Sequence, residues 1–205
     1  FVSFFAKRLF VLVDLFCVQS EEHAARFAPF VREVYVAGNL KFDVEPQEIE
    51  EGKFLKRGER EVITIACTHD PEEKLLLEVL EPMFSRLTIF LAPRHPERFD
   101  AVEKLLVEKK ISFVRLSQLQ HTTGKETVIL VDAMGRLPFC YANSRLAFVG
   151  GSFTDRIGGH NVLEPCLYGC PSLFGPYMQG QRELTSHLLR AGAGRQIAAH
   201  EALST

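Results

Sequence analysis

The sequence predicts an α/β protein built on a doubly wound parallel sheet. From Glu61 onward, short apolar runs alternate with segments of helical character, and the connections between them are short. Strands that are buried on both faces read as continuous apolar runs, and parallel strands need crossover helices between them. We therefore expect one parallel sheet, covered by helices on both faces, from Glu61 to the end of the chain.

Composition sets outer limits on the function. The chain has 205 residues, of which 46% are hydrophobic and 24% are charged, and its formal net charge is -2. It is long enough to bury one core and part of another, and its overall charge gives no reason to expect nucleic acid as a partner. The five cysteines form no Cys-x-x-Cys pair. Buried reduced thiols are expected, as in a cytosolic protein, rather than disulfides or a metal site.

The N-terminal stretch is apolar without being a membrane span. Lys7, Arg8 and Asp14 interrupt it well short of the roughly 20 apolar residues that a spanning helix needs. It also lacks the small-residue cleavage site of a signal peptide. Because the chain begins at Phe1 rather than at Met, we expect it to be a fragment of a longer protein.

The first 60 residues predict the end of one domain and a linker. A helix ending at Phe10 and a strand over Val11–Val18 come first, and Ser20 is a typical N-cap for a helix over Glu21–Phe30. A strand over Val34–Ala37 follows. Residues 44–60 are polar with little periodicity, which indicates an interdomain linker with a short helix. The predicted domains are residues 1–43 and 61–205.

The second domain alternates strictly between strands and helices. Asp70, Pro71 and Glu73 have the residue types of an N-cap, a first helical position and a capping-box partner, so a helix should start there. The expected strands are Glu61–Cys67, Leu87–Leu91, Ile111–Leu116, Thr127–Val131, Leu146–Val149, Cys170–Phe174 and Gln196–Ala198. The other expected helices are Glu97–Lys109, Leu137–Asn143 and Gln181–Arg190.

A glycine-rich loop follows the strand Leu146–Val149. It contains two glycine pairs, 150–151 and 158–159, and leads to Asn161, a good N-cap, with Glu164 three residues later. Asn-x-x-Glu can be a capping box alone, or the loop and the helix start can form an anion site. The pattern matches neither the dinucleotide fingerprint nor the P-loop. The two glycine pairs, which a cap does not need, favour the anion site.

Other candidate residues also follow strand ends. Arg94 would lie at the carboxyl edge of the sheet, where open α/β folds bind ligands. Its guanidinium could fork onto a phosphate or carboxylate, although an exposed structural arginine is the alternative. Gly135 and the segment Asn161–Glu164 should reach the same edge. These groups can therefore converge on one ligand.

Several segments together resemble the Kdo transferases, which move 3-deoxy-D-manno-octulosonic acid (Kdo) from CMP-Kdo onto a lipid A precursor. They are Gly38-Asn-Leu-Lys-Phe-Asp43, Thr68-His-Asp-Pro-Glu-Glu73, Ala92-Pro-Arg-His-Pro-Glu-Arg98, Gly150-Gly-Ser, Gly158-Gly-His-Asn-Val-Leu-Glu-Pro165, and Leu173-Phe-Gly-Pro176. The resemblance implies a GT-B glycosyltransferase with two Rossmann-like domains. This chain would contain the end of the N-terminal acceptor domain and the C-terminal donor domain, truncated at its C-terminus.

The resemblance also implies roles for particular residues. Lys41 would be the catalytic cation that stabilises charge in the transition state. The expected CMP contacts are Pro93, Arg94, Met134, Gly135, Arg136, Asn161, Val162, Leu163 and Glu164. Among them, Glu164 would accept hydrogen bonds from the ribose hydroxyls, and the glycine loop with the helix start at Asn161 would hold the phosphate. The family has an acidic residue where this chain has Arg136, so only a backbone contact would carry over there.

The function implied is inverting transfer of Kdo in lipopolysaccharide biosynthesis, with no cofactor or metal beyond the donor CMP-Kdo. The general base would be a carboxylate outside this chain, so the fragment is expected to bind nucleotide without turnover. Expected partners are CMP-Kdo, the lipid A precursor and, through the missing domain, the cytoplasmic face of the bacterial inner membrane, but no nucleic acid. The alternatives are another GT-B sugar-nucleotide enzyme, such as a UDP-sugar transferase or epimerase, and a non-catalytic nucleotide-binding module.

Overall fold

The computed structural model describes residues 2–49, 60–119 and 125–198, and it divides into two compact units between Glu45 and Pro46. Each unit is described by itself. Part of the predicted linker over residues 44–60 lies outside the described residues.

The first unit is small. Its elements are α1 (Val2–Phe10), β1 (Phe16–Val18), α2 (Glu21–Phe27), β2 (Val34–Val36) and the 3-10 turn η1 (Leu40–Phe42). β1 and β2 pair in parallel, and Ser20 caps α2 as predicted, accepting the His23 N–H at 3.3 Å. α2 ends at Phe27 instead of Phe30, because Pro29 has no backbone N–H to continue the helical hydrogen bonds.

The second unit contains a seven-stranded sheet. Its strands are β3 (Glu61–Thr68), β4 (Leu87–Pro93), β5 (Phe113–Arg115), β6 (Val128–Leu130), β7 (Leu146–Val149), β8 (Ser172–Phe174) and β9 (Gly194–Gln196). The order is β5-β6-β4-β3-β7-β8-β9, and every pair is parallel. The predicted parallel sheet is therefore confirmed.

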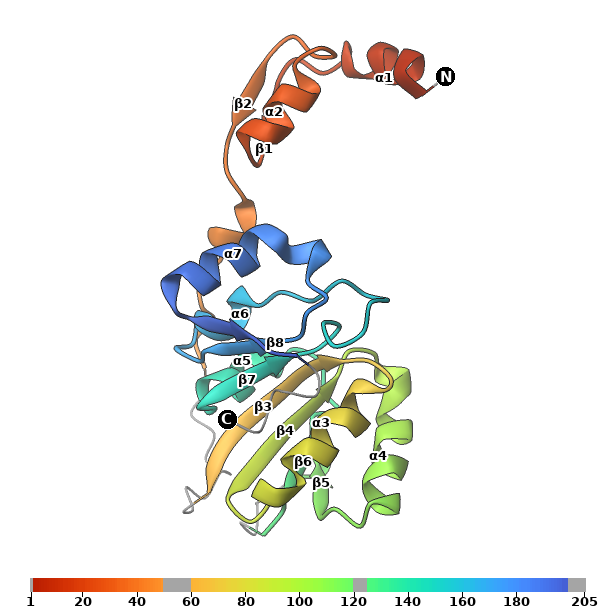
Figure 1. Ribbon diagram of the computed structural model, residues 1–205, viewed down its shortest axis with the longest axis vertical. Helices are drawn as coiled ribbons and strands as arrows, with labels where there is room; N and C mark the ends of the chain where they lie inside the picture. Colours follow the sequence, from red (N-terminus) through yellow and green to blue (C-terminus); the bar gives the residue numbers. More distant parts are fainter. Residues whose placement is uncertain (1, 50–59, 120–124, 199–205) are drawn as a thin grey trace. The chain divides into compact units, whose positions relative to one another are not determined.

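Helices cover both faces of this sheet (Figure 1). They are α3 (Glu72–Leu80), α4 (Phe99–Glu108), α5 (Leu137–Ala142), α6 (Leu163–Cys166) and α7 (Arg182–Ala191), with 3-10 turns η2 (Glu81–Met83), η3 (Pro96–Arg98), η4 (Leu116–Gln118) and η5 (Gln179–Gln181). β7 has the predicted bounds, whereas β8 and β9 begin two residues away from theirs.

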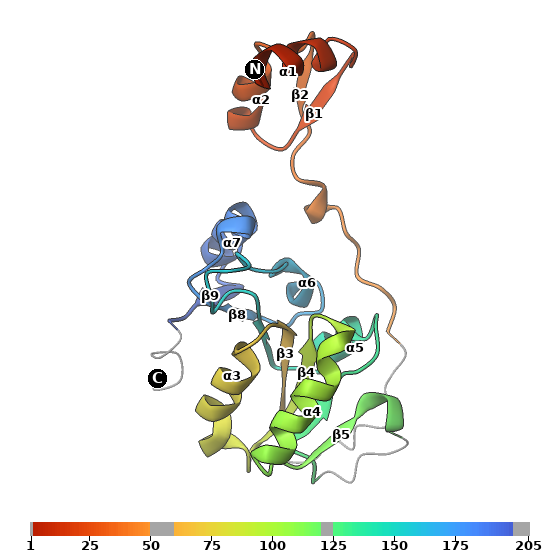
Figure 2. The same cartoon turned by 90° about the vertical axis from the view of Figure 1, so that its right-hand side faces the viewer.

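Alternate residues of each central strand pack against different helices. In β4, Ile89 and Leu91 lie in a core cluster with side chains of α3 and α4, whereas Phe90 and Ala92 lie in a cluster with α5. On the other side of β3, Val149 of β7 packs with residues of α7. Figure 2 shows α3 and α4 together over β3 and β4. Because both faces are buried, the strands could be recognised in the sequence as continuous apolar runs.

The cysteines are free thiols, and their burial varies. Cys140 and Cys170 are buried as expected, Cys67 and Cys166 are partly buried, and Cys17 is exposed. Within residues 2–49, 60–119 and 125–198, no helix is both long and apolar enough to cross a membrane. In the same ranges, no group of three or more histidine, cysteine or acidic side chains is placed to hold a metal ion.

Candidate functional site

The site lies where the carboxyl ends of β4, β3 and β7 meet. These three strands are neighbours in the sheet: the chain passes from β3 to β4 on one side, and later crosses from β6 to β7 on the other side of β3. Such a reversal opens a crevice beyond the strand ends, and open α/β sheets bind ligands there. The segments that emerge at this point are Thr68–His69, Arg94–His95 and Gly150–Gly151.

The end of β3 is joined directly to the loop that carries Arg94. Pairing with β4 shifts between Ala66 and Thr68, where Cys67 has a positive φ of 55°. Beyond the shift, the Arg94 N–H donates to the Thr68 carbonyl at 3.1 Å. Pro93 is buried at the end of β4 and the Arg94 side chain is exposed. The predicted Pro93–Arg94 contact therefore relies on Arg94 for its side-chain chemistry.

The first glycine pair allows a close approach between the β7 loop and the start of α3. A Cβ at Gly150 would lie 2.7 Å from the Cys67 carbonyl oxygen and 2.8 Å from Glu72 Oε2, and one at Gly151 would lie 2.7 Å from the His160 ring. Gly151 also has a φ of +66°, which favours glycine. Both glycines are thus explained by packing within the protein.

The start of α3 differs from the prediction. Asp70 is not the N-cap: the cap residue is Pro71, and it makes no side-chain cap bond. Instead, the carboxylate of Glu72, which is fully buried, accepts N–H groups from His69, Gly151, Ser152 and Phe153 at 2.8–3.1 Å. The expectation that the first half of the glycine loop holds a phosphate is wrong in this respect, because these N–H groups already have an acceptor.

Glu73 is likewise not a capping-box residue. Its carboxylate accepts the Thr68 hydroxyl at 2.9 Å and binds Arg98 through Nε and Nη2 at 3.3 and 2.9 Å. Glu73 is 1% exposed, so this is a buried two-point ion pair. It links the first turn of α3 to η3, the turn that follows Arg94. Asp70 lies 3.9 Å from the same guanidinium, at the surface.

Three histidines lie close together beside these strand ends. The Nε2 atoms of His69 and His160 lie 2.8 Å apart, and the ring centroid of His95 is 5.3 Å from that of His69. Since one Nε2 must donate and the other accept, the pair shares one proton between these atoms. Burial, with His69 and Arg94 nearby, lowers the pKa of His160 to about 4. Burial also lowers the pKa of His69, so both rings are neutral at pH 7.

The segment from Asn161 to Glu164 leads into a helix of one turn, α6 (Leu163–Cys166), and not into a long helix. Asn161 Oδ1 accepts the Leu163 N–H at 3.0 Å, but the cap position is Val162, and Glu164 makes no return bond to complete a capping box. A four-residue helix has a weak dipole, so the predicted dipole contribution is small. Val162 is buried in the core with Leu163 packed against it, and the Val162 carbonyl accepts the Ser172 hydroxyl at 2.8 Å. Among the described residues, no acceptor is found for the N–H groups of His160 and Asn161.

Glu164 and Arg94 lie close enough to influence each other. Burial raises the pKa of the Glu164 carboxyl, and the Arg94 guanidinium opposes that shift. Burial raises the pKa of the Cys67 thiol to about 11, with Glu164 adding to the effect, so this thiol is un-ionised at neutral pH. The structure thus brings Arg94, His160 and Glu164 together at one sheet edge, as the sequence predicted for Arg94 and Glu164.

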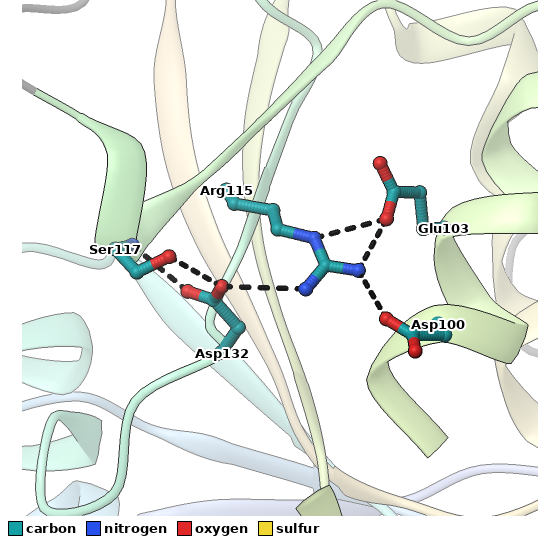
Figure 3. Close-up of polar contacts among 5 residues, drawn as sticks. All are labelled: Asp100, Glu103, Arg115, Ser117 and Asp132. Atoms are coloured by element: carbon teal, nitrogen blue, oxygen red, sulfur yellow. Dashed lines mark hydrogen bonds and ion pairs between the residues drawn. The ribbon is translucent and has the colours of Figure 1, made fainter. Parts of the chain in front are cut away.

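The turn with Met134, Gly135 and Arg136 is exposed, and it follows β6, the neighbour of β4. It is held by the polar cluster drawn in Figure 3. Asp132, just before the turn, accepts the N–H and hydroxyl of Ser117 at 2.8 and 2.6 Å. Arg115 lies 3.8 Å from Asp132 and also pairs with Asp100 and Glu103 of α4. Asp132 therefore anchors the turn to β5 and α4.

Two further observations concern residues outside this cluster. Lys41 lies in η1 of the first unit, and its predicted catalytic role stays a prediction. Tyr141 of α5 has a buried hydroxyl without a hydrogen-bond partner among the described residues. Burial, with Cys67 and Glu164 nearby, raises the pKa of that hydroxyl.

Sequence reasoning missed several residues that build the site: His69, Glu72, Arg98 and His160. The segment Thr68-His-Asp-Pro-Glu-Glu73 was a signal for two of them. Two adjacent glutamates in a first helical turn also fit a favourable helix dipole, and that simpler explanation concealed their tertiary partners.

Comparison with known proteins indicates the family to which the chain belongs. No protein-family model matches it. It is 36% identical over 199 residues to a 3-deoxy-D-manno-octulosonic acid transferase of Chlamydophila psittaci, covering 93% of this chain and 46% of that protein. A transferase of the same name from Bordetella pertussis is 33% identical over 196 residues, covering 88% of this chain and 45% of the relative. The chain thus spans less than half the length of these relatives.

A solved structure matches as well. The C-terminal CMP-Kdo binding domain of WaaA from Acinetobacter baumannii aligns with a TM-score of 0.66 at 36% identity, covering 69% of this chain and 75% of that one. This match confirms the predicted fold class, a Rossmann-like C-terminal domain of a GT-B protein. The sequence motifs, the sheet and these relatives agree, and the chain belongs to the 3-deoxy-D-manno-octulosonic acid (Kdo) transferase family.

Proposed function

We propose that this chain is the donor-binding part of an enzyme that transfers Kdo from CMP-Kdo to a lipid A precursor in lipopolysaccharide biosynthesis. The observation that carries the proposal is the likeness of this chain, over 69% of its length, to a solved CMP-Kdo binding domain at 36% identity. The convergence of Arg94, His160 and Glu164 at the sheet edge of that unit supports it.

In this proposal each group at the sheet edge has a separate task. The Arg94 guanidinium binds the phosphate of CMP, helped by the N–H groups of His160 and Asn161. The Glu164 carboxylate accepts the ribose hydroxyls. The turn of Met134, Gly135 and Arg136 contacts the nucleotide through its backbone, and Pro93 shapes the end of β4. The backbone of Val162 and Leu163 completes the wall beside Glu164.

The chemical step would invert the anomeric centre of Kdo. An acceptor hydroxyl, deprotonated by a general base outside this chain, attacks that carbon as the bond to CMP breaks. Negative charge develops on the departing phosphate, and Lys41 offsets it, a contribution of a few kcal/mol for a well-placed group. The donor is used without a metal or cofactor. The second unit therefore holds the leaving group, and it does not supply the base.

The lipid acceptor indicates where in the cell the reaction would take place. A lipid A precursor resides in a membrane, whereas CMP-Kdo is a soluble sugar nucleotide. The enzyme would therefore work at the cytoplasmic face of the bacterial inner membrane, with the membrane contact made by parts of the protein that precede this chain. CMP-Kdo and the lipid A precursor are its proposed partners, and nucleic acid is not among them.

The test is calorimetric titration of the protein with CMP and, in parallel, UMP. We expect CMP to bind preferentially, and the variant Glu164→Gln to weaken CMP binding by at least about tenfold, or about 1.4 kcal/mol. Glu78→Gln is the matched control, because Glu78 lies on the exposed face of α3 and pairs with Lys109. Equal binding of UMP, or no binding by protein whose fold circular dichroism has verified, would contradict the proposal.

A further inference from the structure

The glycine loop surrounds an anion that belongs to the protein itself. The Glu72 carboxylate receives the N–H groups of His69 and Gly151 on Oε2, at 2.9 and 2.8 Å, and those of Ser152 and Phe153 on Oε1, at 3.1 and 2.9 Å. Three of the four donors come from consecutive residues of the loop after β7. This is the arrangement of backbone donors that usually binds a phosphate.

The fit between this carboxylate and its donors is complete. An ionised carboxylate has about four lone-pair sites, two on each oxygen, and each oxygen of Glu72 receives two N–H groups. The side chain is fully buried, and the missing Cβ of Gly150 leaves the space that Oε2 fills. No lone-pair site of Glu72 and none of these four N–H groups remains for a ligand.

Two structural routes lead from Glu72 to the segment that faces the ligand. The first passes through the loop: Gly151, held by Glu72, accepts the Gly159 N–H on its carbonyl at 2.7 Å, one residue before His160. The second passes through His69, whose N–H binds Glu72 and whose Nε2 lies 2.8 Å from Nε2 of His160. Both routes end at His160, where the segment to Glu164 begins.

We propose that Glu72 is a positioning residue of the nucleotide site, whose carboxylate fills the loop's ring of N–H groups and so directs the ligand phosphate to Arg94 and the His160–Asn161 backbone. The inference rests on the proposed function. In this inference the three loop N–H groups bind the Glu72 carboxylate, and the ligand phosphate binds beside them, at Arg94 and the His160–Asn161 backbone. Glu72 acts through His160 and the loop, and it does not touch the ligand.

The first test uses the unaltered chain. Amide hydrogen exchange followed by NMR should show slow exchange for His69, Gly151, Ser152 and Phe153 in the free protein. Saturation with CMP should leave the signals of these four amides nearly unmoved, while those of His160 and Asn161 shift. Large shifts at Gly151–Phe153 with CMP, or fast exchange there in the free protein, would overturn the inference. If CMP does not bind, the proposed function fails, and with it the ligand half of this inference, while slow exchange would still establish the internal anion.

The second test is Glu72→Gln, which keeps the shape of the side chain and replaces one acceptor oxygen by an NH2 group that opposes two of the N–H donors. At a temperature where circular dichroism shows both proteins folded, we expect the Kd for CMP to rise at least about tenfold. Exchange at Gly151–Phe153 should accelerate as well. Glu78→Gln, on the exposed face of the same helix, should change neither quantity.

A purely structural role predicts a different result. In that case Glu72→Gln would lower the thermal midpoint but leave the Kd for CMP unchanged wherever the variant is folded, which would overturn the inference. If the variant does not fold, the exchange and shift measurements on the unaltered chain decide alone.

Discussion

Tyr141 allows a test of how a buried hydroxyl without a hydrogen-bond partner affects the stability of the protein. Its hydroxyl is buried, and no described residue bonds to it. Removing a buried hydroxyl that makes no hydrogen bond loses nothing in the folded state and removes a desolvation cost. We therefore expect Tyr141→Phe to leave the free energy of unfolding unchanged or to raise it by up to about 1 kcal/mol, as measured by urea denaturation.

Ser152→Ala is the matched comparison, because it removes a buried hydroxyl that does have partners. Ser152 Oγ donates to the Val149 carbonyl at 2.6 Å and accepts the Gly175 N–H at 2.9 Å. Its removal should cost about 1–3 kcal/mol, since one buried donor and one acceptor lose their partner. An equal loss in Tyr141→Phe would show that the tyrosine hydroxyl has a partner in solution.

His160 makes stability depend on pH at the residue scale. Its pKa is about 4 in the folded chain, lowered by burial and by His69, Arg94 and His95. In the unfolded chain it is near 6.5. As pH falls from about 6.5 to about 4, the unfolded state therefore takes up a proton that the folded state does not, and stability declines across this window.

Replacing His160 should remove that contribution. We expect the free energy of unfolding of His160→Gln to fall less steeply than that of the unaltered chain between about pH 6.5 and pH 4. Because the side chain is partly exposed, the difference should be on the order of 1 kcal/mol. Urea denaturation at a series of pH values measures it, and parallel curves for the two proteins would contradict the lowered pKa.

At the scale of elements, the first turn of α3 joins three strand ends. Glu72 reaches the loop after β7, while Glu73 binds Thr68 at the end of β3 and Arg98 after β4. The carboxylates of two neighbouring residues therefore connect to opposite sides of the crevice. A helix with carboxylates in its first turn is also favoured by its own dipole, so local and tertiary effects act in the same direction.

Arg98→Ala should strongly weaken the connection that Glu73 makes between the first turn of α3 and the chain after β4. It leaves the buried Glu73 carboxylate with the Thr68 hydroxyl alone, and breaking a buried pair costs about 3 kcal/mol. Lys109→Ala, which removes a pair with Glu78 at the surface, should cost much less. Chemical denaturation of both variants provides the comparison. Similar losses would mean that Glu73 is solvated in the folded protein.

At the scale of the whole molecule, the second unit should work without the first. Among the described residues, its core clusters contain none of the first 45, and every predicted CMP contact lies within it. We expect a chain of residues 46–205 to unfold cooperatively and to bind CMP within about threefold of the full chain's Kd. Calorimetry on both chains tests this.

Lys41 provides the matching control in the full chain. Its proposed task is to stabilise charge in the transition state, so Lys41→Ala should leave the Kd for CMP nearly unchanged. A loss of CMP affinity above about tenfold, either in Lys41→Ala or in the shorter chain, would show that the first unit contributes to nucleotide binding.

The α/β class, the parallel sheet and most strands could be predicted from the sequence, because burial on both faces leaves continuous apolar runs such as Leu146–Val149. The candidate edge could be predicted for the same reason: Arg94, Gly135 and Glu164 each follow a strand, and parallel strands end on one side. Helix starts were less predictable. Asp70 and Asn161 have the residue types of helix N-caps, yet the cap positions are Pro71 and Val162.

Only the tertiary structure decided which groups meet. The order of strands sets β3 between β4 and β7 and so brings the start of α3 against the glycine loop. The partners of Glu72 in that loop lie 79 to 81 residues away in the chain, and those of Glu73 are split between two strand ends. Local spacing cannot encode such contacts, because glutamate in a first turn and glycine in a loop are each stable for local reasons alone. The sequence by itself thus determined the sheet and the candidate edge for a ligand, while the folded chain decided that the anion within the loop is the carboxylate of Glu72.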